Sequence, residues 1–279
     1  MAVAGLLRLA RPVNCAMSAL GVGIGGVVAA RSGAWGEFAG PLVLAAAAAS
    51  SFTAGGNALN DLYDRETDRI NHPDRPLPSG AVTLRQARMF AVAAFVLAGL
   101  VAVLVNVYAF TVVILNIALM VVYEASFKAQ GAPGNVVIAY LVGSLFLFAG
   151  VSVFRSSAEP LVRTSLLAAL AFFTTVGREI SKDIQDVRGD VDRRTLPQRI
   201  GIRRAGWVAG IAFVLGVLLS VAPVAGHVLS TAYAALVIPA DGMFIYAALH
   251  SAANPARSQR VAKYGMIVAL AAFLAGALA

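Results

Sequence analysis

The sequence predicts an all-α membrane protein, and three observations support that fold class. Of the 279 residues, 59% are hydrophobic and only 13% are charged, whereas soluble domains average about 25% charged residues. The apolar residues fall into long charge-free runs, and the basic residues gather in the short segments between these runs. This pattern excludes an ordinary soluble domain, a disordered chain, a disulfide-stapled module and a coiled coil.

Nine apolar runs predict nine transmembrane helices, because most of them approach the roughly 20 residues that cross about 30 Å of hydrocarbon as helix. Only Asn106 separates the third run from the fourth, so we expect a tight helical hairpin there. The first run lacks a clear small-residue cleavage site and is interpreted as a span rather than a signal peptide. In chain order the runs are Val13–Ala30, Phe38–Asn57, Met89–Val105, Val107–Val122, Val136–Phe154, Thr164–Gly177, Ala205–Ala222, His227–Ala248 and Tyr264–Ala279.

The eighth run contains two exceptions to its apolar character, Pro239 and Asp241. A proline in a membrane helix frees a backbone carbonyl that needs a new partner. An ionisable residue within a span is costly and usually faces the interior of the bundle. We therefore expect Asp241 to belong to a structural polar cluster, and a catalytic role is the alternative.

The basic residues predict the orientation in the membrane. With nine spans, 19 of the 22 Lys and Arg residues lie on one side, and only Arg31, Arg155 and Arg163 lie on the other. Cytoplasmic loops carry the excess of basic residues, so we expect a multi-pass cell-membrane protein with a cytoplasmic amino terminus and an external carboxy terminus. This distribution explains the net charge of +8 without a nucleic-acid partner.

Two kinds of site are not expected from the residue inventory. Cys15 is the only cysteine, so no intramolecular disulfide can form. His72, His227 and His250 lie far apart and lack ligand spacing, which argues against a zinc site.

Ten of the 14 carboxylates lie on the basic side in two segments, about residues 58–88 and 178–204. The first contains Asp61-Leu-Tyr-Asp64-Arg-Glu-Thr-Asp68 and the second contains Asp183-Ile-Gln-Asp186-Val-Arg-Gly-Asp190, so both read D-x-x-D-x-x-x-D with an offset of 122 residues. Similar stretches follow them, Arg75-Pro-Leu-Pro-Ser-Gly80 and Arg194-Thr-Leu-Pro-Gln-Arg-Ile-Gly201. We interpret this as an internal repeat, and repeat interfaces in membrane bundles often hold the binding site.

The spacing of each acidic motif suggests a cation site. Residues three and four apart share one helical face, where several carboxylates repel one another unless a cation compensates them. Mg²⁺ takes hard oxygen ligands and is commonly held by one or two carboxylates together with substrate phosphates. Two such clusters can hold two metal ions around a diphosphate leaving group. The alternative is a pair of solvated loops in which the acids pair with neighbouring arginines.

At these residues the chain resembles the UbiA superfamily of intramembrane prenyltransferases. The first superfamily motif is matched by Asn60-Asp61-Leu-Tyr-Asp64-Arg-Glu-Thr-Asp68 and the second by the segment from Asp183 to Asp190. Two stretches, Arg178 to Asp190 followed by Thr195-Leu-Pro197, and Ile70 to Gly80, are most similar to the archaeal branch that prenylates geranylgeranylglyceryl phosphate.

The resemblance implies one prenyltransferase domain over residues 1–279, a bundle of nine transmembrane helices around a central cavity with cytoplasmic cap segments. It implies Mg²⁺-dependent transfer of a geranylgeranyl group from its diphosphate to the glycerol hydroxyl of a lipid-like acceptor, in archaeal ether-lipid synthesis. The site would open on the cytoplasmic side, with two Mg²⁺ ions bridging to the diphosphate. The implied metal ligands are Asn60, Asp64, Asp68, Asp186 and Asp190, and Asp61 and Asp183 would support them or share ligation.

Further polar residues on the same side are candidates for substrate contacts. The resemblance suggests that Tyr123 and Lys128 contact the diphosphate, and the alternative is an aromatic-belt tyrosine with a snorkelling lysine. Arg65 and Lys182 lie beside the motifs and can contact phosphate, or they form local ion pairs. Asn14 can bind substrate, or it caps the first spanning helix.

Three rival functions differ in what they require. The CDP-alcohol phosphotransferases also use aspartate clusters, but their two clusters lie within one segment, whereas these lie 122 residues apart. A cation transporter would place its acids near the bilayer midplane rather than at helix ends. A UbiA-type enzyme with an aromatic acceptor, such as 4-hydroxybenzoate or a chlorin, is the alternative that the sequence pattern does not exclude.

Overall fold

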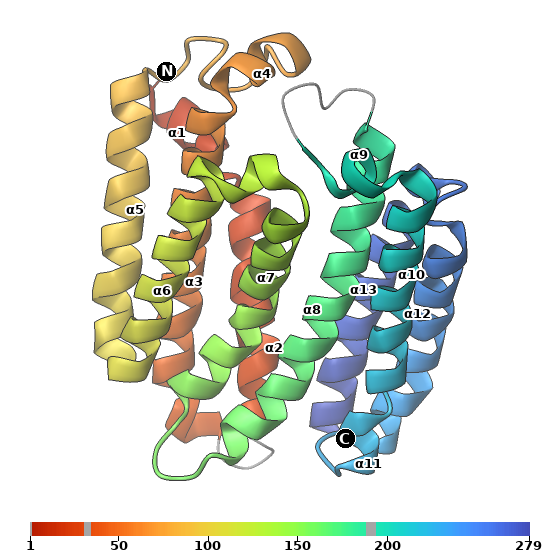
Figure 1. Cartoon of the computed structure of the whole chain (residues 1–279). Coiled ribbons are helices and arrows are strands. Elements are labelled where there is room, and N and C mark those ends of the chain that lie inside the picture. The colour runs from red at the N-terminus through yellow and green to blue at the C-terminus, as the bar shows by residue number, and fades with distance from the viewer. Residues whose placement is uncertain (1, 31–34, 188–193) are drawn as a thin grey trace. The chain divides into compact units, whose positions relative to one another are not determined.

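The computed structural model describes residues 2–30, 35–187 and 194–279, and these form helices and loops without a strand (Figure 1). The helices are α1 (Ala2–Ala10), α2 (Pro12–Ala30), α3 (Trp35–Tyr63), α4 (Arg65–Asn71), α5 (Leu84–Val105), α6 (Val107–Ala125), the 3₁₀ helix η1 (Phe127–Gln130), α7 (Ala132–Ser152), α8 (Glu159–Asp186), α9 (Leu196–Ile200), α10 (Ile202–Leu219), α11 (Ala222–Ala225), α12 (Thr231–His250) and α13 (Pro255–Leu278).

The expectation of nine transmembrane helices is confirmed. Within the described part of the chain, nine helical stretches are long and apolar enough to cross a membrane. Two of them continue well beyond the apolar runs seen in the sequence, because α3 ends at Tyr63 and α8 ends at Asp186. The first aspartate of each acidic motif therefore lies within a spanning helix rather than in a segment that follows it.

The described residues divide into two compact units. The first unit contains residues 1–23 and 38–125 and includes α3, α5 and α6. Its expected hairpin is confirmed, since α5 and α6 pack against each other on either side of Asn106. The backbone of Asn106 is extended and its Oδ1 accepts the N–H of Ala109 at 2.8 Å. This bond satisfies one of the unpaired donors at the start of α6.

The second unit contains residues 24–37 and 126–279. Its long helices α7, α8, α10, α12 and α13 pack closely on one another (Figure 1). Small residues permit this packing, as expected of membrane helices. At Gly143 on α7, an added Cβ would lie 2.7 Å from the carbonyl oxygen of Ala168 on α8. Tyr233 of α12 is fully buried and stacks on Phe273 of α13, with ring centroids 5.9 Å apart.

Asp241 has a defined polar partner in the second unit. Its Oδ2 accepts a hydrogen bond from Ser220 at 2.7 Å, and the Tyr233 hydroxyl donates to the Ser220 carbonyl at 2.8 Å. Ser220 lies at the end of α10, and Pro239 lies inside α12 two residues before Asp241. These contacts join α10 to α12, which is the arrangement expected if Asp241 belongs to a structural polar cluster.

The two acidic motifs occupy similar positions in the helices that carry them. Asp61 lies two residues before the end of α3, and Asp183 lies three residues before the end of α8. Each exit stretch contains a glycine with positive φ, 73° at Gly80 and 83° at Gly201. A glycine adopts this conformation without the strain that a Cβ would cause, so each chain segment turns sharply before the next spanning helix.

The contact between α7 and α8 predicts the effect of one substitution. Gly143→Val should lower the free energy of unfolding by about 1–3 kcal/mol, because the added methyl groups meet a backbone carbonyl that cannot rotate away. The measurement is thermal unfolding of the purified protein in detergent.

Gly242→Val is the matched control, because Gly242 lies inside α12 and an added Cβ there meets nothing within 4 Å. Equal melting temperatures for the two variants would contradict the close packing of α7 on α8.

Candidate active site

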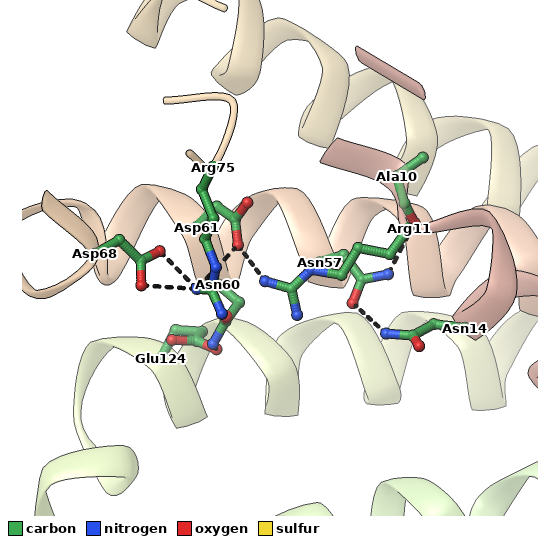
Figure 2. Close-up of polar contacts among 9 residues, drawn as sticks. All are labelled: Ala10, Arg11, Asn14, Asn57, Asn60, Asp61, Asp68, Arg75 and Glu124. Atoms are coloured by element: carbon green, nitrogen blue, oxygen red, sulfur yellow. Dashed lines mark hydrogen bonds and ion pairs between the residues drawn. The ribbon is translucent and has the colours of Figure 1, made fainter. Parts of the chain in front are cut away.

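Two aspartates of the first motif are buried and paired with arginines (Figure 2). The Asp61 side chain is 3% exposed, forms an ion pair with Arg11, and lies 3.8 Å from Nη1 of Arg75. Nη1 of Arg75 also donates to both oxygens of Asp68, at 2.7 and 2.6 Å. A buried carboxylate needs such compensation, because desolvation strongly disfavours an isolated charge.

Local backbone structure brings the two arginines to these carboxylates. Arg11 lies between α1 and α2 with a φ of 52°, and Pro12 begins α2. Arg75 lies in the loop after α4, where its N–H donates to the carbonyl of His72 at 3.0 Å. Pairing of the acids with neighbouring arginines was one of the two interpretations of the sequence, and the structure identifies Arg11 and Arg75 as the partners of Asp61 and Asp68.

Asn60, Asp64 and Asp68 lie on successive helical turns. The N–H of Asp64 donates to the Asn60 carbonyl at 2.9 Å, and the N–H of Asp68 donates to the Asp64 carbonyl at 2.8 Å. The hydrogen-bond register therefore continues through Asp64, where α3 gives way to α4. Asp64 is half-buried. The motif spacing predicted one face for Asp61, Asp64 and Asp68, and Asp61 and Asp68 do share a partner, Arg75.

Glu124 is a buried carboxylate of the first unit that sequence reasoning did not assign. It lies in the last turn of α6, is 6% exposed, and accepts a hydrogen bond from Nδ2 of Asn60 at 2.9 Å (Figure 2). Its signal in the sequence was weak. It is a single acid at the end of an apolar run, without the repeat that drew attention to the aspartates.

Arg65 forms a local ion pair, as one of its two interpretations expected. Its Nε donates to Glu66 Oε1 at 2.8 Å, and Arg69 donates to Glu66 Oε2 at 3.1 Å. The hydrogen bond from Arg65 lowers the pKa of the Glu66 carboxyl below its ordinary value. A contact between Arg65 and a phosphate stays a prediction.

Asn14 does not cap the first spanning helix, and that interpretation was wrong. Pro12 begins α2, so Asn14 lies inside the first turn. Its Nδ2 lies 3.4 Å from Oδ1 of Asn57, and Nδ2 of Asn57 donates to the Ala10 carbonyl at 2.8 Å (Figure 2). Asn14 therefore lies at the edge of the polar cluster that contains Asp61. Its contact with a substrate stays a prediction.

The second motif has an amide partner of its own. Nδ2 of Asn135, near the start of α7, donates to Asp183 Oδ2 at 2.8 Å. Asp186 ends α8 and is half-buried, and Lys182 is exposed. Asp190 lies outside the residues that the structure describes. Asn135 is 8% exposed and was not singled out from the sequence.

Tyr123 belongs to the first unit and Lys128 to the second. Tyr123 is half-buried in the last turn of α6, and Lys128 is half-buried in η1. Their contact with a diphosphate stays a prediction.

The donor groups of the first motif have the chemistry that Mg²⁺ requires. Asn60, Asp64 and Asp68 supply amide and carboxylate oxygens on consecutive turns, and Arg11 and Arg75 pair with Asp61 and Asp68. Among the described residues, no group of three or more His, Cys, Asp and Glu side chains is arranged to hold a metal ion. Mg²⁺ does not need such a group, because it is usually held by one or two carboxylates plus substrate phosphates and water.

Comparison with known protein families and curated proteins gives a consistent result. The family model described as "UbiA prenyltransferase family" matches residues 19–275. The digeranylgeranylglyceryl phosphate synthase of Methanopyrus kandleri is 40% identical, over 98% of this chain and 98% of the relative. The enzyme of the same name from Halobacterium salinarum is 39% identical, over 98% and 97% of the two chains.

Solved structures extend the comparison to the fold. A structure described as digeranylgeranylglyceryl phosphate synthase in membranes matches with a TM-score of 0.84 and 30% identity, over 99% of both chains. A UbiA homologue from Archaeoglobus fulgidus bound to GPP and Mg²⁺ matches with a TM-score of 0.62. The latter is 19% identical and covers 95% of this chain and 99% of its own, so it supports the fold alone.

The buried ion pairs predict a loss of stability on truncation of one partner. Arg11→Ala should lower the free energy of unfolding by about 1–3 kcal/mol, because Asp61 is then left with Arg75 alone at a longer distance. Thermal unfolding in detergent measures the change.

Arg88→Ala is the control, since Arg88 is exposed on α5. If both variants melted at the wild-type temperature, the pairing of Arg11 with Asp61 would carry no stability.

Proposed function

The chain belongs to the UbiA prenyltransferase family, and we propose that it transfers a geranylgeranyl group from geranylgeranyl diphosphate to the glycerol hydroxyl of geranylgeranylglyceryl phosphate. The family match covers residues 19–275 and confirms the resemblance identified in the sequence. The protein is therefore a multi-pass membrane enzyme that transfers prenyl groups. The product would be an archaeal ether lipid precursor.

The observation that carries the proposed acceptor is the full-length similarity to relatives of one name. Digeranylgeranylglyceryl phosphate synthases from several archaea are 35–40% identical, and the first of them covers 98% of this chain. The structure of the same name aligns along the whole chain at 30% identity. An aromatic acceptor remains the second candidate, and an acceptor assay separates the two.

Within this proposal, Mg²⁺ is held by oxygen donors of the two motifs. Asn60, Asp64 and Asp68 would contribute from the first motif, and Asp186 and Asp190 from the second. We assign one ion to the oxygen donors of each motif. Bound Mg²⁺ would neutralise the charge that develops on the departing pyrophosphate.

Asp61 and Asp183 take supporting roles in the proposal. Asp61 compensates Arg11 and lies near Arg75, and Asp183 accepts a hydrogen bond from Asn135. Their carboxylates thereby hold neighbouring side chains in place. In this assignment they are positioning residues rather than principal metal ligands.

The chemical step needs separation of charge and the exclusion of water. The bond from the allylic carbon to the diphosphate oxygen breaks, and its electron pair leaves with pyrophosphate. The glycerol oxygen then bonds to that carbon and loses its proton to a carboxylate or a pyrophosphate oxygen. Spanning helices provide apolar walls that keep water from the allylic cation, and Tyr123, Lys128, Arg65 and Lys182 are the proposed diphosphate contacts.

The acidic motifs would open to the cytoplasm. This part of the proposal rests on the 19 basic residues that the sequence places on their side and on the positive-inside rule. The amino terminus would then be cytoplasmic and the carboxy terminus external.

Removal of the metal or of either motif should stop prenyl transfer. Asp64→Ala and Asp186→Ala should each lower turnover at least about a hundredfold, because the departing pyrophosphate loses electrostatic stabilisation, and EDTA should do the same to the wild-type enzyme. The measurement is release of pyrophosphate from geranylgeranyl diphosphate with acceptor present.

Asp74→Ala is the control within the same acidic segment, since Asp74 is exposed. Its turnover should stay near that of the wild type. Near-normal turnover in Asp64→Ala or Asp186→Ala would remove the two-motif mechanism.

An acceptor panel tests the substrate assignment. Purified enzyme with geranylgeranyl diphosphate and Mg²⁺ should convert geranylgeranylglyceryl phosphate to a product heavier by one geranylgeranyl group, detected by mass spectrometry. Product from 4-hydroxybenzoate, and none from geranylgeranylglyceryl phosphate, would replace the proposed acceptor with an aromatic one.

A further inference from the structure

Glu124 lies in an environment that requires a partner for its carboxylate. It is 6% exposed at the end of α6, an apolar helix long enough to cross a membrane. The hydrogen bond from Nδ2 of Asn60 at 2.9 Å links it to the first residue of the acidic motif on α3. The contact lies within the first compact unit.

The chemistry of this contact decides which way the Asn60 amide faces. An asparagine side chain has one end that only donates and one that only accepts, and an ionised carboxylate only accepts. The amide nitrogen must therefore face Glu124, because the opposite rotamer would place two oxygens against each other. The Asn60 carbonyl oxygen consequently points away from Glu124.

The direction of that oxygen matters for cation binding. Asn60 precedes Asp64 by one helical turn, and their backbones are hydrogen-bonded at 2.9 Å. A hard cation held beside Asp64 needs oxygen donors. If the Asn60 amide were flipped, it would present N–H groups that repel the cation.

We propose that Glu124 is a positioning residue, which orients Asn60 so that its side-chain oxygen is available to the divalent cation of the first motif. The inference rests on the proposed function, because it assumes that this motif binds a metal. Partners that orient a metal ligand typically change metal affinity by about 10- to 100-fold when they are removed. Glu124 itself does not touch the metal or the substrate.

The most informative variants change the preferred orientation of the side chain at position 60 without changing the size of either side chain. Glu124→Gln keeps the side-chain shape and can accept or donate, so either rotamer of Asn60 finds a hydrogen bond. The exchange N60D/E124Q places a carboxylate at position 60, which presents oxygen in both rotamers, and an amide at position 124 that donates to it. Glu37→Gln is the control, because the Glu37 side chain is 65% exposed.

The experiment measures Mn²⁺ binding by the full-length protein in detergent, using electron paramagnetic resonance with pyrophosphate present and without prenyl donor or acceptor. Glu124→Gln should weaken Mn²⁺ binding about tenfold, and N60D/E124Q should restore it to within about threefold of the wild type. The Mg²⁺ concentration needed for half-maximal turnover should rise in the single variant, while turnover at saturating Mg²⁺ should fall by less than threefold. Glu37→Gln should match the wild type.

The outcomes separate the two proposals. Wild-type Mn²⁺ affinity in Glu124→Gln, or equal weakening in Glu124→Gln and the exchange variant, overturns the role of Glu124 and leaves the proposed function standing. Absence of Mn²⁺ binding by the wild type overturns both. If Glu124→Gln does not fold, the exchange variant decides, because near-wild-type affinity supports the positioning role and tenfold weaker binding overturns it.

Discussion

Burial of carboxylates at the ends of apolar helices is the constraint on which the candidate site depends. A charge in a medium of low polarity is stable only if a cation or several hydrogen-bond donors compensate it. Asp61 and Asp68 are compensated by arginines from two separate loops, and Glu124 and Asp183 are compensated in part by asparagine amides. The partners of Asp61, Glu124 and Asp183 each join a spanning helix to another segment of its unit, and Arg75 joins Asp68 of α4 to the loop that follows it. The charges needed for chemistry thus also determine how the polar ends of the helices are held.

The apolar part of each helix obeys a different requirement. Lipid is as apolar as the side chains, so close packing rather than the hydrophobic effect holds membrane helices together. Gly143 permits the approach of α7 to α8, and the stacked rings of Tyr233 and Phe273 join α12 to α13. Polar groups in this region are paired locally, as Asp241 is with Ser220. A rigid apolar scaffold of this kind can keep water away from a reactive cation.

Much of the fold could be predicted because the position of a membrane-spanning helix depends on the local amino-acid composition. Runs of apolar residues predicted nine spans, which the described structure confirms. The single residue Asn106 between two runs predicted the hairpin. The motif spacing also predicted that Asp61, Asp64 and Asp68 share a helical face, since i to i+4 geometry is local, and Asp61 and Asp68 share Arg75 as a partner. Helix ends were less predictable. Helical hydrogen bonding continues past the last apolar residue, so α3 ends at Tyr63 and α8 ends at Asp186.

The sequence by itself determined the fold class, the family, and the residue types that can bind a metal and a diphosphate, because periodicity, charge distribution and the repeated motif are all encoded along the chain. Only the tertiary structure decided which side chains meet. Arg11 and Arg75 lie 50 and 14 residues from Asp61, and Glu124 lies 64 residues from Asn60. No local sequence pattern specifies such pairs. They form because folding brings helix ends that are distant in the sequence close together.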